Sequence, residues 1–257
     1  MKFALAVREV GGTIEENIEG ILSSIRHAAA RGAELVLFSE ASLTGLRLTD
    51  DPRRDLALGV SIGGAELTRI GGAAREARFH VALGFLERDG HTLYDSAVLF
   101  GPTGERLLIY RRLSPGWQAR GADPESYGRG AGFTYCDCAL GRLGFLICGD
   151  LFEDALVAQA AHAHLNLLLF PFARSRSKSG FTQAAWQAEE WPHYAARLER
   201  MGAAALMVNH LDREEPRYFG GAWLVDARGK VVGHRPIGRK GLTIADLPAE
   251  RRGPGVC

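Results

Sequence analysis

An alternation of short apolar runs with amphipathic stretches limits this chain to a small set of folds. Residues 2–7 (KFALAV) and 34–40 (ELVLFSE) are apolar runs of strand length. Between them apolar residues recur at helical spacing, Thr13 and Glu16 have the spacing of a capping box, and Gly32 supplies a stop. This segment therefore predicts one β-α-β unit.

The alternation continues through a helix at 65–77 and strands at 81–87, 94–100 and 106–112. An Asp-Gly turn joins the first two of these strands, and a GPTG turn joins the last two. Two hairpins therefore follow one another, and we expect sheets that mix parallel and antiparallel pairs.

The second half of the chain repeats this alternation and is predicted to end in a hairpin. Several of its strand-length runs are apolar throughout, which is typical of strands covered on both faces. We therefore predict one α/β domain spanning residues 1–257, built as a layered sandwich. The predicted elements are strands at 133–136, 142–148, 165–172 and 204–210, helices at 153–164 and 182–202, and a closing hairpin at 220–236.

Composition narrows the class of partner. The chain has 31 Lys and Arg residues against 30 Asp and Glu, and this net charge of +1 supplies no general attraction to nucleic acid or anionic lipid. No run approaches the roughly 20 apolar residues that span a bilayer, and the N-terminus lacks a signal-peptide pattern. We therefore expect a cytoplasmic protein with a small-molecule partner, neither nucleic acid nor membrane, and four reduced cysteines.

Three predicted strands end on a polar residue: Glu40, Arg112 and Cys148. Strand ends in α/β folds are where reacting groups are displayed. A carboxylate, a cation and a thiol that meet there suit acyl transfer, with Glu40 as base, Cys148 as nucleophile and Arg112 beside the developing oxyanion. Each residue also has an ordinary interpretation, as a core cysteine, a capping glutamate or a solvated arginine.

Four blocks of the sequence resemble, in order, the blocks of the carbon–nitrogen hydrolase (nitrilase) superfamily. They are FSEASLTG (38–45), YDSAVLFGPTGERLLIYRR (94–112), LGRLGFLICGDLFED (140–154) and YFGGAWLVDARGKVV (218–232). Together they run through most of the chain. The resemblance implies a four-layer α-β-β-α sandwich with mixed sheets, paired into a homodimer or a higher homo-oligomer.

The resemblance also implies an activity and a set of site residues. Members of this family hydrolyse non-peptide C–N bonds with a Glu-Lys-Cys triad, without a metal or another cofactor. Glu40 matches the family's base and Cys148 its nucleophile, and Glu125 lies about where a supporting glutamate often stands. The backbone N–H of Gly149 would receive the oxyanion. We therefore expect no metal site and no cofactor.

Three positions depart from the family pattern, one of them in LSPGW (113–117), where the family often has a histidine. Tyr110-Arg111-Arg112 stands where the family has Tyr-Arg-Lys, and Gly149 stands where an aromatic residue usually follows the cysteine. Arginine keeps the positive charge, but it cannot release a proton near neutral pH. The glycine leaves a site that is either enlarged or degraded. Asp150 favours the amidase and carbamoylase branch over true nitrilases.

A basic loop, ARSRSKSGF at 173–181, follows a predicted strand. In the family this loop often borders the pocket, so Arg174, Arg176 or Lys178 could receive a substrate carboxylate or phosphate. A solvated basic loop is the alternative interpretation. Trp117 is a candidate for the pocket mouth, although buried packing would explain it equally well.

Two functions remain open at the level of sequence. The first is a hydrolase of a small amide or N-carbamoyl compound that acts through a thioester at Cys148. The second is a catalytically inactive protein of the same fold with a small-molecule binding or regulatory role. The change from lysine to Arg112 separates the two, because an Arg112 that pointed away from Cys148 would exclude the active triad.

Overall fold

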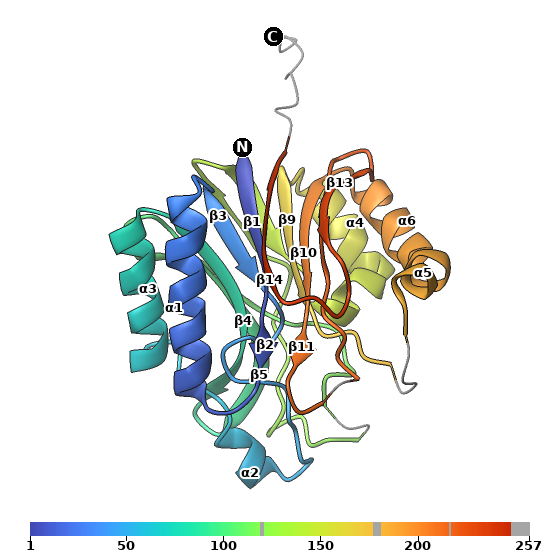
Figure 1. Cartoon of the computed structure of the whole chain (residues 1–257). Helices are drawn as coiled ribbons and strands as arrows, with labels where there is room; N and C mark the ends of the chain where they lie inside the picture. Colours follow the sequence, from blue (N-terminus) through green and yellow to red (C-terminus); the bar gives the residue numbers. More distant parts are fainter. Residues whose placement is uncertain (119–120, 177–180, 216, 248–257) are drawn as a thin grey trace.

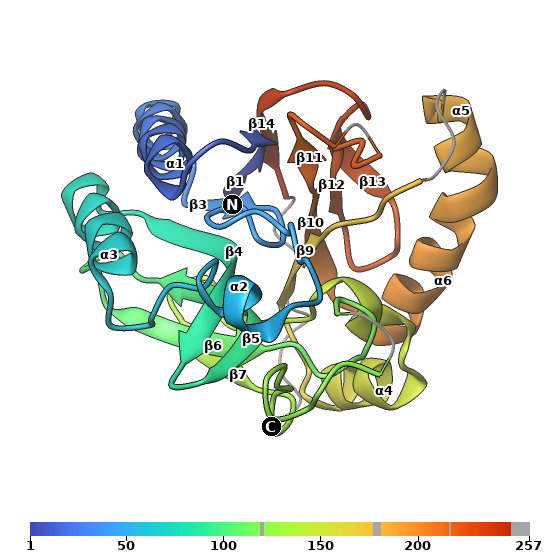
Figure 2. The same ribbon diagram turned by 90° about the horizontal axis from the view of Figure 1, so that it is seen from below.

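The computed structural model describes residues 1–118, 121–176, 181–215 and 217–247. Two six-stranded sheets face each other, and helices cover the outer face of each sheet (Figures 1 and 2). This is the layered sandwich with mixed sheets that the sequence predicts, with the four-layer α-β-β-α order that the family resemblance implies.

The first sheet has the order β14-β1-β3-β4-β5-β6. β1, β3 and β4 are parallel, and β4, β5 and β6 form the two successive hairpins that the sequence predicts. The strands are β1 (Lys2–Val7), β3 (Leu35–Phe38), β4 (His80–Asp89), β5 (Thr92–Phe100), β6 (Arg106–Arg111) and β14 (Gly241–Asp246).

The second sheet has the order β13-β12-β10-β9-β8-β7, with β8, β9 and β10 parallel. A short ribbon of β2 (Glu9–Val10) and β11 (Leu211–Asp212) links the two halves of the chain beside the sheets. The strands of the second sheet are β7 (Tyr135–Cys138), β8 (Gly141–Phe145), β9 (Leu167–Phe172), β10 (Ala204–Asn209), β12 (Ala222–Val225) and β13 (Val231–Arg235).

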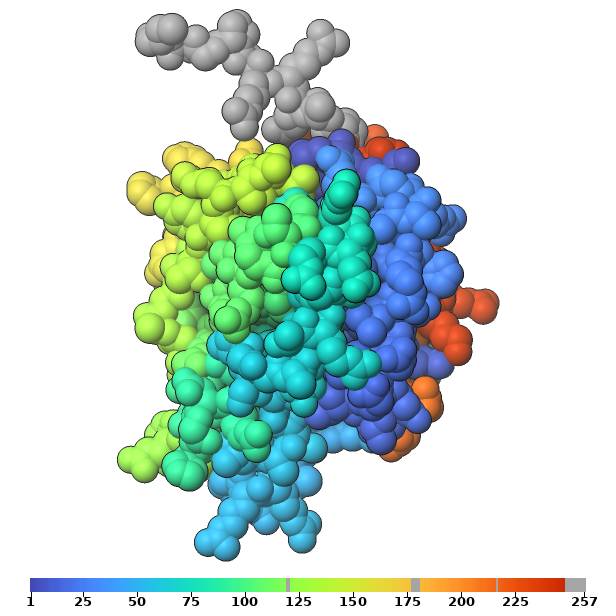
Figure 3. Space-filling model, turned by 90° about the vertical axis from the view of Figure 1, so that its left-hand side faces the viewer, coloured from blue at the N-terminus to red at the C-terminus, as the bar shows by residue number. Residues whose placement is uncertain are grey.

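The outer layers are two helix pairs. α1 (Ile14–Ala30) and α3 (Ala65–Ala77) lie side by side on the first sheet, on the face that Figure 3 shows. α4 (Asp154–His162) and α6 (Trp191–Met201) cover the second sheet. α1 begins with the predicted capping box, in which Thr13 and Glu16 each bond the other's backbone N–H.

The long helix expected at 182–202 is interrupted. The segment begins with α5 (Gln183–Ala185), continues as a π-helical turn (Trp186–Glu190) and restarts as α6. Pro192 stands in the first turn of α6, and because proline has no backbone N–H the helical hydrogen-bond ladder cannot run through it. A short helix, α2 (Pro52–Leu56), is not predicted from the sequence, because five residues are too few to show helical periodicity.

The C-terminal part of the described chain adds one strand, β14, beyond the predicted closing hairpin. After β12 and β13, β14 crosses back to the first sheet and pairs antiparallel with β1. β1 is therefore an interior strand, and its two faces are both buried. Phe3 and Leu5 face the second sheet, whereas Ala4 and Ala6 pack in the cluster that includes α1.

Within the described residues, no helix combines the length and the apolar character that a bilayer crossing requires.

Candidate active site

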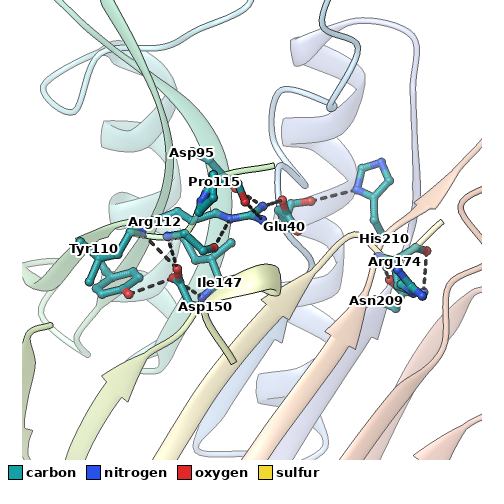
Figure 4. A network of polar contacts seen from close by, with 12 residues as sticks. Glu40, Asp95, Tyr110, Arg112, Pro115, Ile147, Asp150, Arg174, Asn209 and His210 are labelled. Carbon is teal, nitrogen blue, oxygen red and sulfur yellow. Dashed lines mark hydrogen bonds and ion pairs between the residues drawn. The ribbon is translucent and has the colours of Figure 1, made fainter. Parts of the chain in front are cut away.

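The three predicted strand-end residues converge between the sheets. Glu40 follows β3 and Arg112 follows β6 in the first sheet, whereas Cys148 lies just beyond β8 in the second. Arg112 Nη1 lies 3.1 Å from Glu40 Oε1, and Figure 4 shows the two side chains directed at each other. Arg112 Nη2 lies only 2.6 Å from the place that a Cβ on Gly149, the residue after Cys148, would take. Arg112 therefore points into the site.

A glycine in β4 positions the base. After β3 the chain turns sharply at Ala41, whose φ is +46°. The turn packs on Gly84, where a Cβ atom would lie 2.7 Å from Glu40 Cα and 2.8 Å from Ala41 N. The N–H of Gly84 donates to Ser39 O at 3.2 Å, and the carbonyl of Gly84 accepts from Leu43 N at 3.3 Å. The backbone of Glu40 is thus held against β4.

The side chain of Glu40 is 1% exposed, and only one of its two carboxylate oxygens has a hydrogen-bond partner in the described structure. Oε1 accepts from Arg112, whereas Oε2 has no hydrogen-bond partner among the described residues. Burial, and next the charge of Cys148, raise the pKa of Glu40 to about 8, against the lowering effect of Arg112. The free oxygen is therefore available to take a proton near neutral pH.

Arg112 is buried and fixed by several acceptors. A planar guanidinium has five N–H donors, and four of the Arg112 donors are used within the described structure. The fifth, on Nη2, is left for another acceptor. Burial alone would lower the pKa of Arg112, but the negative charges of Cys148, Glu40 and Asp95 raise it. The four acceptors are Glu40 Oε1 (3.1 Å), Asp95 Oδ2 (3.2 Å), Ser114 Oγ (2.9 Å) and the carbonyl of Pro115 (3.2 Å).

Asp95 is a second buried carboxylate that the sequence reasoning missed. It lies in β5, is 1% exposed and shares Arg112 Nη1 with Glu40. Burial and the nearby charge of Glu40 raise the pKa of Asp95 well above its usual range. A carboxylate directly before the largely apolar run SAVLF (96–100), within the same predicted strand, was the available signal, because a buried acid needs a partner. The expected supporting residue, Glu125, is exposed, and its described contacts do not include this network.

Cys148 stands on a strained turn. It begins a 3₁₀ turn (Cys148–Phe152) with φ +46°, a left-handed conformation that is costly for a residue with a Cβ. Asp150, which is fully buried, holds this turn by accepting four hydrogen bonds from two separate segments. The donors are Tyr110 Oη (2.9 Å), Leu113 N (3.1 Å), Ser114 N (2.7 Å) and Ile147 N (3.0 Å).

Two of the residues that depart from the family pattern, Arg112 and Gly149, lie against each other. A Cβ atom on Gly149 would lie 2.6 Å from Arg112 Nη2 and 2.8 Å from Ser114 Oγ. Both distances are shorter than real Cβ contacts, so the guanidinium occupies the volume that a side chain at position 149 would need. The glycine and the arginine therefore fit each other.

The basic loop is arranged around a carboxylate. Arg174 binds Glu190 through two hydrogen bonds of 3.0 Å, and Arg176 also pairs with Glu190. The backbone N–H of Arg174 donates to Asn209 Oδ1 at 2.8 Å, so Arg174 lies on the side of the site where His210 contacts Glu40 (Figure 4). Lys178 lies outside the described residues. Trp117 is buried in a separate cluster, 5.9 Å ring to ring from Tyr127.

His210 is a further residue that the sequence did not single out. It follows β10, is fully buried, and its Nδ1 lies 2.9 Å from the carbonyl of Glu40, to which it donates in the matching tautomer. Figure 4 shows this contact on the side of Glu40 opposite Arg112. The second sheet therefore supports the backbone of the base from across the sandwich.

Comparison with known proteins agrees with this arrangement. The family model of carbon-nitrogen hydrolases matches residues 5–254. The chain belongs to this family.

The sequence relatives include nitrilases, and the fold is similar to that of an amidase. An aliphatic nitrilase of Sinorhizobium fredii (strain HH103) is 28% identical over 97% of this chain and 87% of its own length. Nitrilase 1 of Arabidopsis thaliana is 31% identical over 52% of this chain, which is 44% of its own length. The fold is similar to that of an amidase from Nesterenkonia sp. AN1, with a TM-score of 0.80, 22% identity and coverage of 98% and 96% of the two chains.

Proposed function

We propose that this protein hydrolyses the C–N bond of a small amide or N-carbamoyl compound through a thioester at Cys148. The observation that carries the proposal is the buried arrangement of Glu40 and Arg112 beside Cys148, in which Glu40 Oε2 and one N–H of Arg112 have no partner in the described structure. A base and a cation oriented toward a thiol supply what acyl transfer requires.

In the acylation step Glu40 Oε2 takes the thiol proton, and the sulfur of Cys148 attacks the carbonyl carbon. The oxygen of the tetrahedral intermediate is held by the backbone N–H of Gly149 and the remaining Nη2–H of Arg112. The C–N bond then breaks, and Glu40 gives its proton to the leaving nitrogen. In the second step Glu40 takes a proton from water, the hydroxyl attacks the thioester, and the acid leaves as the proton returns to sulfur.

Glu40 carries every proton in this scheme. Arg112 stays charged at any working pH, so it stabilises negative charge but cannot act as an acid. A pKa of about 8 lets Glu40 exist in both protonation states near neutral pH, as alternate acid and base action requires. The scheme therefore does not need the lysine that the family usually has.

The fit between Gly149 and Arg112 favours the catalytic function over the inactive alternative. A decayed site accumulates unrelated changes, whereas here the space lost to a larger cation is the space freed by the missing side chain. Asp95 adds a buried hydrogen-bond acceptor to the same guanidinium. The changes at Arg112 and Gly149 are therefore consistent with a site rebuilt around arginine.

An amide is the substrate class we favour. The structures of the Nesterenkonia amidase include a Glu-to-Gln variant with acrylamide added at its active-site cysteine and a Glu-to-Leu variant with the acetamide moiety of fluoroacetamide at that cysteine. Those reactions belong to that enzyme, but the similar fold supports testing short amides first. Nitriles remain the second class to test, because the sequence relatives include nitrilases.

The test measures ammonia release from short aliphatic amides and N-carbamoyl amino acids, together with the rate at which iodoacetamide labels Cys148, read by intact mass. We expect turnover by the wild type and its loss in Cys148→Ala and Glu40→Gln. Labelling should accelerate as pH rises through about 8, because ionised Glu40 is the form that accepts the thiol proton.

Glu40→Gln is the matched control for the pH profile, since it keeps the size of the side chain and removes the base. Its labelling should be slower than that of the wild type at pH 8. Wild-type labelling identical to that of Glu40→Gln, with no turnover of either substrate class, would exclude the proposal and leave the inactive alternative. The homodimer predicted from the resemblance is checked separately, by sedimentation velocity.

A further inference from the structure

A cavity of about 590 Å³ lies between α1 and β14, and the residues that line it do not include Glu40, Arg112 or Cys148. Figures 1 and 2 both place α1 beside β14. Its volume falls within the range of sites that hold small molecules. The cavity is therefore a second candidate site.

Positive charge dominates the lining of this cavity. Four basic side chains face a single carboxylate, that of Glu9, among the described residues that line it. Glu9 is already bonded to one of the four, Lys240, at 2.8 Å. Of the remaining three, Arg213 pairs at 3.8 Å with Glu16, which lies outside the lining, whereas Arg8 and Arg31 have no carboxylate partner among the described residues. The four basic residues are Arg8, Arg31, Arg213 and Lys240.

The unpaired side chain of Arg8 is the main indication that the cavity binds a ligand. Its side chain is half-buried, yet it has no hydrogen bond and no ion pair with any residue that the structure describes. Burial, and then the positive charge of Arg213, lower the pKa of Arg8. A partly desolvated guanidinium beside a second one is unfavourable, and a bound anion would relieve both the desolvation and the repulsion.

A glycine inside α1 leaves the space that the Arg8 guanidinium occupies. A Cβ atom on Gly20 would lie 1.5 Å from Arg8 Nη2 and 1.9 Å from its Cζ, so the guanidinium lies directly on the helix backbone. Glycine in a helix interior costs about 1 kcal/mol relative to alanine. Gly20 thus lowers the helix propensity of α1 at the residue on which the unpaired Arg8 guanidinium lies. A larger residue there would displace Arg8.

We propose that this cavity binds the phosphate group of a small phosphate monoester. The fork of Arg8 matches two phosphate oxygens, and Arg213 and Arg31 add charge for a dianion. Val7 and Leu242 in the same lining supply apolar surface for the organic part of the ligand. The proposal is independent of turnover at Cys148.

Calorimetric titration of the full chain with inorganic phosphate and with glycerol 3-phosphate, at constant ionic strength, tests the proposal. We expect the wild type to bind both ligands and Arg8→Gln to weaken binding about tenfold or more. Gly20→Ala should also weaken binding, although it leaves the net charge unchanged, because its Cβ displaces the guanidinium. Arg53→Gln, which removes an exposed charge on α2, is the matched control and should bind like the wild type.

Three results would overturn the proposal. One is a wild type that binds neither ligand. Another is Gly20→Ala binding as tightly as the wild type, which would mean diffuse attraction without a built site. The third is Arg8→Gln changing the oligomeric state in sedimentation velocity while phosphate binding stays the same. That result would assign Arg8 to a carboxylate of a second copy of this chain.

Discussion

At the scale of single residues, the guanidinium of Arg112 fills the space that a side chain at position 149 would need. The 2.6 Å separation between Arg112 Nη2 and a Cβ at position 149 leaves no room for both groups. Gly149→Ala should therefore cost about 1–3 kcal/mol of unfolding free energy through overpacking and should slow the labelling of Cys148. In an Arg112→Lys background the same change should cost less than about 0.5 kcal/mol, because the shorter cation lacks Nη2.

Urea denaturation of the four proteins of this double-mutant cycle measures the coupling. Gly132→Ala is the control, because nothing lies within 4 Å of a Cβ at that position. In the lysine background Ser114 loses its bond to Arg112 Nε and is free to rotate away from the new methyl group. Equal destabilisation by Gly149→Ala in both backgrounds would show that the two residues do not depend on each other.

At the scale of elements, β4 acts as the support on which the base is mounted. A Cβ at position 84 would meet backbone atoms of Glu40 and Ala41 at 2.7 and 2.8 Å, and backbone cannot move aside as a flexible side chain can. Gly84→Ala should therefore destabilise the fold by roughly 1–3 kcal/mol. It should also reduce the labelling rate of Cys148 to that of Glu40→Gln, because the carboxylate is displaced with its backbone.

Urea denaturation and iodoacetamide labelling measure the two effects on the same samples. Gly72→Ala in α3 is a suitable comparison, since nothing lies within 4 Å of its Cβ, and alanine there should stabilise the helix by up to about 1 kcal/mol. If Gly84→Ala lost stability but kept the full labelling rate, β4 would not be what positions Glu40.

At the scale of the whole molecule, the return of β14 turns the first strand of the chain into an interior strand. β1 pairs with β3 on one side and β14 on the other, and both of its faces are buried. The amides of Phe3–Val7 should therefore exchange with solvent as slowly as those of β9 and β10, through the largest openings of the molecule.

Hydrogen exchange followed by mass spectrometry measures this directly. β7, an edge strand with exposed residues, is the internal reference and should exchange much faster. Exchange of β1 at the rate of β7 would mean that the pairing of β14 is not part of the stable core, and that the sheet ends at β1.

The sequence by itself determined the local elements and the chemical groups at their ends. Periodicity located α1 and α3 and most of the strands, because burial on one face or on both leaves a pattern that is readable within a single segment. The same reading marked Glu40, Arg112 and Cys148, because each stands where an apolar run stops.

Only the tertiary structure decided what joins those groups. The pairing of β14 with β1, the support of Glu40 by His210 and the fit of Arg112 over Gly149 each connect segments far apart in the chain. Local periodicity carries no information about such contacts, since they depend on how sheets stack and on which atoms compete for one volume. For the same reason Glu125, near the site by its place in the sequence, lies on the surface of the folded protein.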